Sequence, residues 1–244
     1  AGEGFEHWLM KFDGIDNNRD KEEPDPQGYG LIEYAYYLMA VDAGIDMMPC
    51  RLHHEGDRSH FMTRRFDRPM GDDGLSRKLH MQSLCALQHY DFNDPSGYSY
   101  EQAVLTIRQL GLGAPALEQQ FQRAVFNILA RNQDDHVKNI AFLMDRDGAW
   151  SLSPAFDVTY SYNPSGQWTG QHQMSMNGKR DNFVAEDLLS FAETASIKPS
   201  RAKALLSQVA EAVAAWSRYA EKAGIDEKTT VSIAKAHRTI INAA

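Results

Sequence analysis

The chain has 244 residues, 43% of them apolar and 24% charged, so it is long enough to build one large domain or two closely packed lobes. Its formal net charge of −8 argues against direct binding of DNA or RNA, because proteins that bind nucleic acids through their own surface are usually basic. No apolar run approaches the roughly 18–20 residues of a membrane span, and the isolated Cys50 and Cys85 indicate core thiols in a reducing cytoplasm.

The first part of the chain is predicted to be rich in strands. Alternation of apolar side chains predicts a strand, whereas apolar side chains spaced three or four residues apart predict a helix. Trp8, Met10 and Phe12 fall on one face of the first strand, and Lys11 falls on the other. The predicted elements are a strand over residues 7–12, a polar loop over 13–30, a helix over 31–43 and strands over 47–52 and 60–66.

A break in the pattern at residues 67–74, which contain Pro69 and two glycines, marks a candidate lobe boundary. We therefore predict an α+β fold with a strand-rich N-terminal lobe over residues 1–68 and a larger, mainly helical C-terminal lobe over residues 69–244. Its predicted elements are helices over 79–89, 100–110, 116–131, 186–196, 200–223 and 227–241, a strand hairpin over 140–144 and 149–152, and an irregular segment over 154–184.

A polar segment between the long predicted helix and the hairpin carries the strongest chemical signal. It contains Asp134 and Asn139, which are separated by four residues, the spacing of the protein-kinase catalytic loop. In that loop the aspartate accepts the proton of the attacking hydroxyl, and the asparagine binds magnesium. Asp134 is therefore a candidate base, and Asn139 is a candidate metal ligand.

Three further side chains fit the same chemistry. Asp157 follows the hairpin, where a kinase places its main metal ligand, and Mg²⁺ prefers carboxylate oxygens. Lys11 is suited to binding the α- and β-phosphates, and Glu33 on the next helix is suited to pairing with it. Each residue alone is more often an ordinary solvated side chain. Their order along the chain, with the hairpin between Asn139 and Asp157, nevertheless predicts a kinase.

Several segments resemble those of HipA-like serine/threonine kinases, the toxin halves of bacterial toxin–antitoxin pairs. The resemblance covers about residues 7–185. The similar segments are Asp134–Asn139 (an Asp-x-His-x-Lys-Asn box), Ser153–Val158 (a Pro-x-Tyr/Phe-Asp-Val box), Arg65–Arg68 (a strand end leading into the hinge), Glu33–Ile45 and Ser175–Lys179. Val158 and Thr159 after Asp157 also fit these kinases better than eukaryotic ones, which have Phe-Gly there.

The resemblance implies a two-lobed protein-kinase-like fold that uses ATP and Mg²⁺ to phosphorylate a protein serine. The roles it implies are base for Asp134, metal ligands for Asn139 and Asp157, phosphate binding for Lys11 with Glu33, and shaping of the loop for His136 and Lys138. The backbone of Arg65, Phe66 and Asp67 is expected to line the adenine hinge. Asp135 is a less favoured base than Asp134. Asn177 and Lys179 are expected either to assist the active lobe or to form a structural turn.

The resemblance also implies partners. These are a helix-turn-helix antitoxin that carries the complex to operator DNA, and a protein substrate such as an aminoacyl-tRNA synthetase, whose phosphorylation slows translation. The family's phosphate-binding loop, with its autophosphorylated serine, precedes the lysine strand, but only Ala1–Met10 precede Lys11. We therefore expect residues to be missing before Ala1, the N-terminal lobe to be incomplete, and this chain to bind nucleotide poorly.

Three alternatives remain open. A small-molecule phosphotransferase of the aminoglycoside-kinase type would share the catalytic loop and the later aspartate. A pseudokinase that only binds an antitoxin would explain the lack of a phosphate loop, although it would not need Asp134, Asn139 and Asp157. A hydrolytic metal site around His136 is disfavoured, because no second histidine follows at the fourth position.

Overall fold

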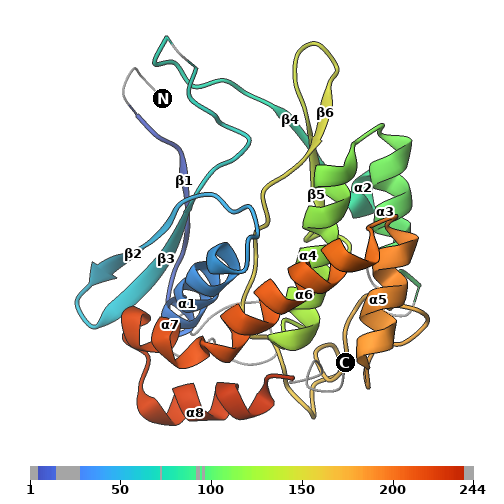
Figure 1. The fold of residues 1–244 in the computed structure, drawn as a ribbon. Helices are drawn as coiled ribbons and strands as arrows, with labels where there is room; N and C mark the ends of the chain where they lie inside the picture. Colours follow the sequence, from blue (N-terminus) through green and yellow to red (C-terminus); the bar gives the residue numbers. More distant parts are fainter. Residues whose placement is uncertain (1–4, 15–27, 72, 92–93, 95–96, 239–244) are drawn as a thin grey trace.

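A computed structural model describes residues 5–14, 28–71, 73–91, 94 and 97–238 of the chain. Figure 1 shows two small antiparallel sheets, the first at the left and the second near the top, with helices forming most of the remainder. The predicted loop over residues 13–30 lies largely outside the described residues. No helix among the described residues is long and apolar enough to span a bilayer.

The first sheet confirms the strands predicted near the N-terminus. It consists of β1 (Trp8–Lys11), β2 (Cys50–Glu55) and β3 (Arg58–Arg64) in the order β1-β3-β2. Gly56, with φ of 61°, closes the β2–β3 hairpin in the left-handed region that glycine tolerates best. The predicted helix is also present as α1 (Tyr29–Asp42), which packs on β2 and β3.

The second sheet corrects one prediction. It has the order β4-β5-β6, where β5 (Ala141–Met144) and β6 (Trp150–Leu152) form the predicted hairpin. The helix predicted over residues 79–89 is wrong, because His80–Ser83 forms β4 and only Leu84–Leu87 forms a helix, α2. Backbone hydrogen bonds from β4 to β5, about sixty residues later in the chain, override the local helical spacing.

The remaining helices follow the predictions closely. They are α3 (Tyr100–Gln109), α4 (Ala114–Leu129), α5 (Ala185–Thr194), α6 (Pro199–Ala214), α7 (Trp216–Ala223) and α8 (Glu227–Ala236). The single helix predicted over residues 200–223 is interrupted at Ala215. The break coincides with the complete burial of Trp216, whose indole N–H donates to the Thr230 carbonyl at 3.0 Å.

Helix α1 connects the first sheet to the C-terminal helices. It packs on the first sheet and also on α6 and α7 (Figure 1). The ring of the fully buried Tyr36 packs edge-on against the Trp216 ring, with the ring centroids 5.3 Å apart. Its hydroxyl donates to the Ala130 carbonyl at 2.6 Å. The predicted lobe boundary near residue 68 stays a prediction, and α1 shares one hydrophobic core with the C-terminal helices.

We expect Gly30→Ala to destabilise the protein by about 1–3 kcal/mol, the usual cost of overpacking. Gly30 lies in the first turn of α1, and an added Cβ would overlap the backbone oxygen of Ser59 on β3. Urea unfolding measures the effect. The control is Gly113→Ala, where the new Cβ meets Pro115 at an ordinary 3.6 Å and the loss should stay below about 1 kcal/mol. Equal losses in both variants would contradict this account of the α1–β3 contact.

Candidate active site

Three elements that are distant in sequence bring charged side chains together beside the first sheet. The Lys11 ammonium on β1 donates to Glu33 Oε1 on α1 at 2.7 Å, and it also donates to Asp157 Oδ1. Asp157 lies in the segment that follows β6, 146 residues after Lys11. The predicted Lys11–Glu33 pair is therefore present, and Asp157 completes a three-residue ion cluster.

Local structure explains why these side chains meet. Lys11 is held in register opposite Phe61 in the β1–β3 ladder. The buried Asp13, two residues later, accepts from the Gly28 amide at 3.0 Å and so connects the end of β1 to the start of α1. Asp157 has φ of 56°, a costly value for a residue other than glycine that recurs at functional sites.

The cluster fixes the charge of its members. Burial works against the charged form of Lys11, but the Glu33 and Asp157 carboxylates outweigh it and raise the lysine pKa well above its usual range. Burial likewise opposes ionisation of Asp157. The Lys11 charge and hydrogen bond, with smaller help from His136 and Asn139, nevertheless lower the pKa of Asp157. Both groups are therefore ionised at neutral pH.

The predicted catalytic loop lies beside this cluster. Asn139 Nδ2 donates to the Asp134 carbonyl at 2.9 Å, and the same side chain contributes a hydrogen bond to Asp157. Asp134 lines the same open cleft as Lys11 and Asp157, with its side chain 47% exposed. The His136 Nε2 atom lies 3.8 Å from Asp134 Oδ1, while Lys138 is exposed. The loop thus places Asp134 and Asn139 at one cleft, and their roles stay predictions.

The neighbouring Asp135 has a different environment. Its buried carboxylate accepts from the Tyr100 hydroxyl at 2.5 Å, from His172 Nδ1 at 2.8 Å and from the Gln173 amide at 2.7 Å. Burial raises its pKa, but His172, together with the hydrogen bonds, lowers it overall. Asp135 is thus an internal anchor of the loop, which favours Asp134 as the base.

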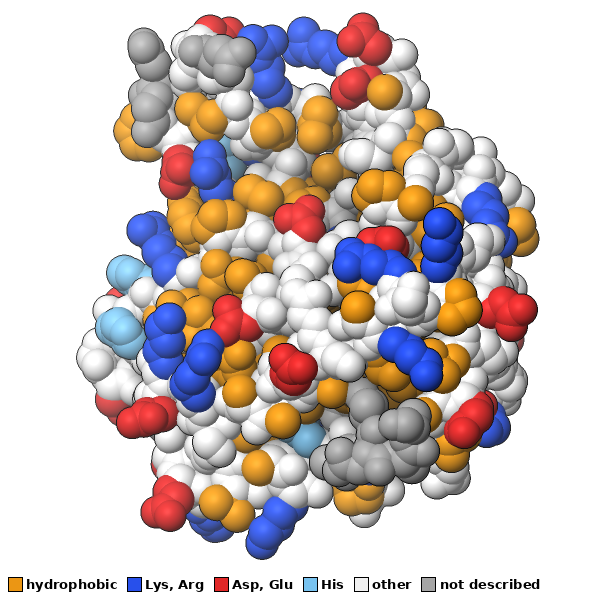
Figure 2. Space-filling model, in the orientation of Figure 1, with side chains coloured by type: hydrophobic (Ala, Val, Ile, Leu, Met, Phe, Trp, Pro, Cys, Tyr) orange, Lys and Arg blue, Asp and Glu red, His pale blue; other side chains and the backbone are white. Residues whose placement is uncertain are grey.

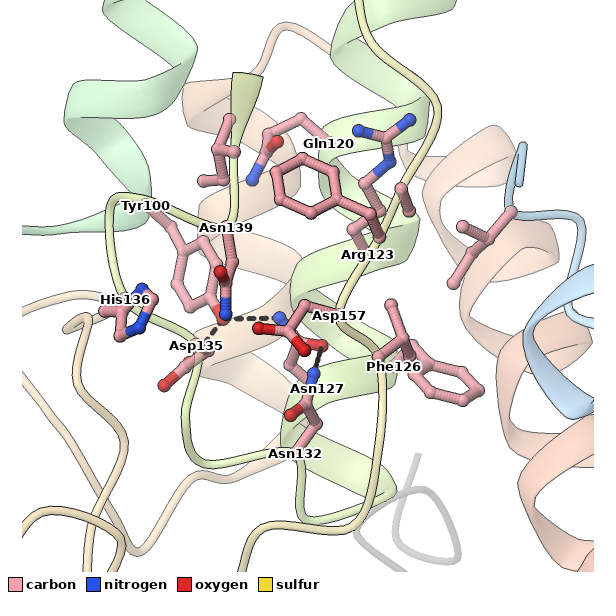
Figure 3. A pocket seen from close by; sticks show the side chains of 15 residues that line it. Tyr100, Gln120, Arg123, Phe126, Asn127, Asn132, Asp135, His136, Asn139 and Asp157 are labelled. Carbon is pink, nitrogen blue, oxygen red and sulfur yellow. Dashed lines mark hydrogen bonds between the residues drawn. The ribbon is translucent and has the colours of Figure 1, made fainter. Parts of the chain in front are cut away.

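Sequence reasoning missed the residues that hold Asp135. Figure 3 shows Asn132, Asn127 and Tyr100 forming a hydrogen-bonded chain that leads to this carboxylate. Its links measure 2.9 Å from Asn132 to Asn127 and 3.0 Å from Asn127 to the Tyr100 hydroxyl. The only sequence signal was the Asp-Asp pair itself, because, apart from Asn132 in the loop, these partners lie on α3, α4 and the irregular segment after β6.

A small buried cavity lies behind the loop. Its volume of about 30 Å³ suits one or two water molecules, and Asn139 and Asp157 line it together with Gln120 and Arg123 of α4 (Figure 3). Among the described residues, both amide atoms of Gln120 and the Arg123 Nε are buried without a protein partner. This mixture of donors and acceptors suits water better than an anion, since an anion has no proton to donate to the Gln120 oxygen.

Two pockets meet at the ion cluster. The apolar one, of about 280 Å³, lies between β1 and the second sheet. Lys11, Glu33 and Asp157 line it together with Leu9, Cys50, Phe61, Phe66, Met81 and Phe156. The more polar cleft, of about 730 Å³, is lined by the same three charged residues and by Asp134. In Figure 2 charges of both signs are dispersed, and hydrophobic side chains gather between the first sheet and β4.

The predicted hinge residues line the apolar pocket. Arg65 forms a two-pronged ion pair with Asp67, with distances of 2.8 and 2.7 Å, and the Phe66 ring lies 5.4 Å from the Phe156 ring. The Arg65 amide donates to the His7 carbonyl, and the Asp67 carbonyl accepts from the Leu79 amide. These two backbone groups therefore hold the strand end in place.

The contacts of Asn177 and Lys179 are those of a structural turn. Asn177 Nδ2 donates to the Asp187 carbonyl, and the Lys179 ammonium donates to the Asp187 carboxylate, both at 2.8 Å. Asn177 also has φ of 50°. Of the two possibilities considered from the sequence, these contacts favour the turn that fastens the segment to α5.

The donor set near Asp157 fits Mg²⁺. An ionised carboxylate and a neighbouring amide oxygen are hard ligands, and Mg²⁺ commonly takes one or two such protein ligands, completed by phosphates and water. Across the described parts of the chain, no three His, Cys, Asp or Glu side chains are grouped to hold a metal ion by themselves. Asp157 and Asn139 therefore fit a metal ion whose remaining ligands come from phosphates and water.

Comparisons with known proteins place this geometry in context. The model of the family "HipA-like C-terminal domain" matches residues 1–216. Among curated proteins, "Putative kinase Y4mE" of Sinorhizobium fredii is 24% identical over 137 residues, which are 53% of this chain and 32% of that protein. The chain therefore spans about a third of this relative.

Two solved structures share the fold. HipA of Shewanella oneidensis, solved with HipB and operator DNA, matches with a TM-score of 0.68 at 16% identity, over 93% of this chain and 61% of that one. The Helicobacter pylori proinflammatory kinase CtkA matches with a TM-score of 0.54 at 12% identity, over 95% and 90%. These likenesses confirm the predicted α+β, protein-kinase-like fold.

We expect Lys11→Met to raise the pKa of Asp157, because burial then acts on the carboxyl without its main opposing charge. Carbon-13 NMR of the side-chain carboxyl measures the shift. In the wild type, the stabilisation from the lowered pKa is present above the unfolded value of about 4 and is lost as the pH falls through the folded value. The exposed Lys203→Met on α6 is the control. An unchanged Asp157 titration in Lys11→Met would contradict the ion cluster.

Proposed function

Because the chain belongs to the family of HipA-like C-terminal domains, we propose that it is the catalytic core of a serine/threonine kinase that transfers the γ-phosphate of ATP to a protein serine. The observation that carries the proposal is the ion cluster of Lys11, Glu33 and Asp157 at the junction of two pockets. A lysine, its glutamate partner and a metal-binding aspartate are the groups that a kinase needs around the phosphates.

The apolar pocket suits an adenine ring. The Arg64 amide donates to the Pro49 carbonyl at 3.0 Å, continuing the β2–β3 ladder. In an antiparallel pair of this kind, the residue opposite normally donates its own amide back to the first residue's carbonyl. Pro49 has no N–H, so it cannot donate to the Arg64 carbonyl. The Arg64 carbonyl is thus suited to accept from the adenine amino group. We place the hinge at the Arg64 carbonyl, one residue before the predicted segment Arg65–Asp67, and at Phe66 within that segment.

The charged residues suit the phosphates. In this structure Lys11 balances the charge of Asp157. A metal cation would compete with Lys11 for the Asp157 carboxylate. We infer that Asp157 and Asn139 hold Mg²⁺, which when bound neutralises phosphate charge. Lys11 would remain paired with Glu33 and would contact the α- and β-phosphates. His136 and Lys138 would shape the loop beside the transferred group.

Asp134 suits the role of base. Its partly exposed carboxylate faces the open cleft, where a substrate serine can approach, whereas three donors already engage Asp135. A positioned carboxylate that accepts the serine proton typically contributes a factor of about 10²–10⁴ to the rate. We therefore assign proton removal to Asp134.

We further propose that the protein is the toxin of a toxin–antitoxin pair and acts in the cytoplasm. HipA of Shewanella oneidensis was solved with HipB and operator DNA, and our chain covers 61% of that HipA chain. A helix-turn-helix antitoxin would supply the DNA contact that a net charge of −8 disfavours. The proposed substrate is a protein such as an aminoacyl-tRNA synthetase, whose phosphorylation would inhibit translation and growth. As the family resemblance implies, the protein would also phosphorylate itself and promote persistence of the bacterium.

The first test is phosphate transfer from γ-³²P-labelled ATP, with Mg²⁺, by the complete protein in a cell lysate. We expect Asp134→Asn to lose at least about 10²-fold in rate, because the base is removed. Asp57→Asn, in the exposed β2–β3 turn, should behave as the wild type. An active Asp134→Asn variant would show that another residue is the base. A wild type that labels neither itself nor any other protein would refute the proposed kinase activity.

Nucleotide binding separates a kinase from a pseudokinase that has lost ATP binding. We expect calorimetry on the complete protein to show ATP binding that depends on Mg²⁺ and weakens by at least about tenfold in Asp157→Asn, which lacks a charged metal ligand. Chelation of Mg²⁺ should weaken binding by the wild type in the same way. Binding by the wild type that is unaffected by chelation would contradict the assignment of Asp157 and Asn139. Transfer to aminoglycosides instead of protein would favour the small-molecule alternative.

A further inference from the structure

The residues that end α8 lie against the start of the catalytic loop. The Arg131 Nε donates to the Ala236 carbonyl at 2.8 Å, and the Arg238 amide donates to the Leu129 carbonyl at 2.9 Å. Arg131, the first residue of the loop, has φ of 56°, so these contacts hold the chain where it leaves α4 in a strained conformation. Residues 236–238 lie beyond the part of the chain that the family model matches.

A chain of hydrogen bonds continues from this tail into the loop. Arg238 Nη1 lies 2.9 Å from His172 Nε2, and His172 Nδ1 lies 2.8 Å from Asp135 Oδ2. An arginine side chain can only donate, so Nε2 carries the lone pair and Nδ1 carries the proton that it donates to Asp135. Arg238 thereby sets the tautomer in which His172 holds the residue adjacent to the proposed base.

The charges in this network are matched. The Arg238 side chain is 9% exposed and forms an ion pair with Asp181. Burial lowers its pKa to about 10, with help from Arg131, while Asp181 and Asp135 act in the opposite direction. Arg238 is therefore charged at neutral pH. Its removal would leave the carboxylates of Asp135 and Asp181 without a cation that they share.

We propose that Arg238 is a positioning residue for phosphate transfer, and that residues 236–238 hold the catalytic loop in its working shape through His172 and Asp135. This proposal rests on the proposed kinase function. The hydrogen bonds lead from Arg238 through His172 to Asp135, the neighbour of Asp134. The ion cluster consists of Lys11, Glu33 and Asp157, on other elements. Loss of Arg238 should therefore slow the transfer step more than it weakens nucleotide binding.

The test compares Arg238→Gln and Arg238→Lys in the complete protein. We expect Arg238→Gln to lower kcat by about 10–100-fold while the KM for ATP changes less than about threefold. Arg238→Lys, which unlike Arg238→Gln keeps the positive charge beside Asp135 and Asp181, should restore at least part of the loss. The control is Arg218→Gln, because Arg218 on α7 also forms an ion pair, with Asp42 at 2.5 Å, but its side chain is 69% exposed.

Each rate is divided by the fraction of folded protein, taken from the number of ATP sites in calorimetry. If Arg238→Gln merely lowers that fraction, and kcat per folded molecule equals the wild-type value, the proposal is overturned. An unchanged kcat in a fully folded Arg238→Gln protein would overturn it as well. A rise in the KM for ATP without a fall in kcat would instead assign Arg238 to the nucleotide site.

Hydrogen exchange of the loop gives a readout that does not need phosphate transfer. We expect amides of residues 132–139 to exchange faster in Arg238→Gln than in the wild type or Arg218→Gln. Nitrogen-15 NMR of His172 should show the proton on Nδ1 in the wild type. If the wild type transfers no phosphate, the kinase proposal fails, and these measurements still decide whether the tail holds the loop. Unchanged exchange would refute that role.

Discussion

The ion cluster of Lys11, Glu33 and Asp157 is the interaction on which the arrangement of the site depends. It joins β1, α1 and the segment after β6, three elements with no sequence proximity. One ammonium shared by two carboxylates is favourable only when the three groups lie close together, because each loses part of its hydration. Its position at the meeting point of an apolar pocket and a polar cleft puts the positive charge of Lys11 where phosphates would lie.

Two adjacent aspartates show how burial divides roles within one loop. Asp135 is engaged by a phenol, an imidazole and a backbone amide, so its carboxylate serves the internal structure. Asp134 keeps a partly exposed side chain at the cleft. A loop that must present one carboxylate to a substrate gains rigidity by anchoring its neighbour in the core. The partners of Asp135 come from α3 and from the irregular segment that precedes α5.

Helix α1 couples the site to the main core. On one side Glu33 contacts Lys11, and on the other Tyr36 packs against Trp216 and donates to the end of α4. A change in the packing of the C-terminal helices would therefore reach Glu33 through a single rigid element. The contacts of Ala236 and Arg238 with Arg131 and Leu129 act at the same place, because they hold the start of the catalytic loop where it leaves α4.

The sequence by itself determined the strands of the first sheet, the β5–β6 hairpin, helices α1, α3 and α4, and the family, because local periodicity and the short motif around Asp134 and Asn139 express them directly. Only the tertiary structure decided that residues 80–83 form β4 and that Ala215 divides α6 from α7, since pairing with β5 and burial of Trp216 are long-range effects. The same holds for the partners of Asp135. Their positions along the chain carry no local pattern, and folding alone brings Tyr100, His172 and Arg238 to one buried network.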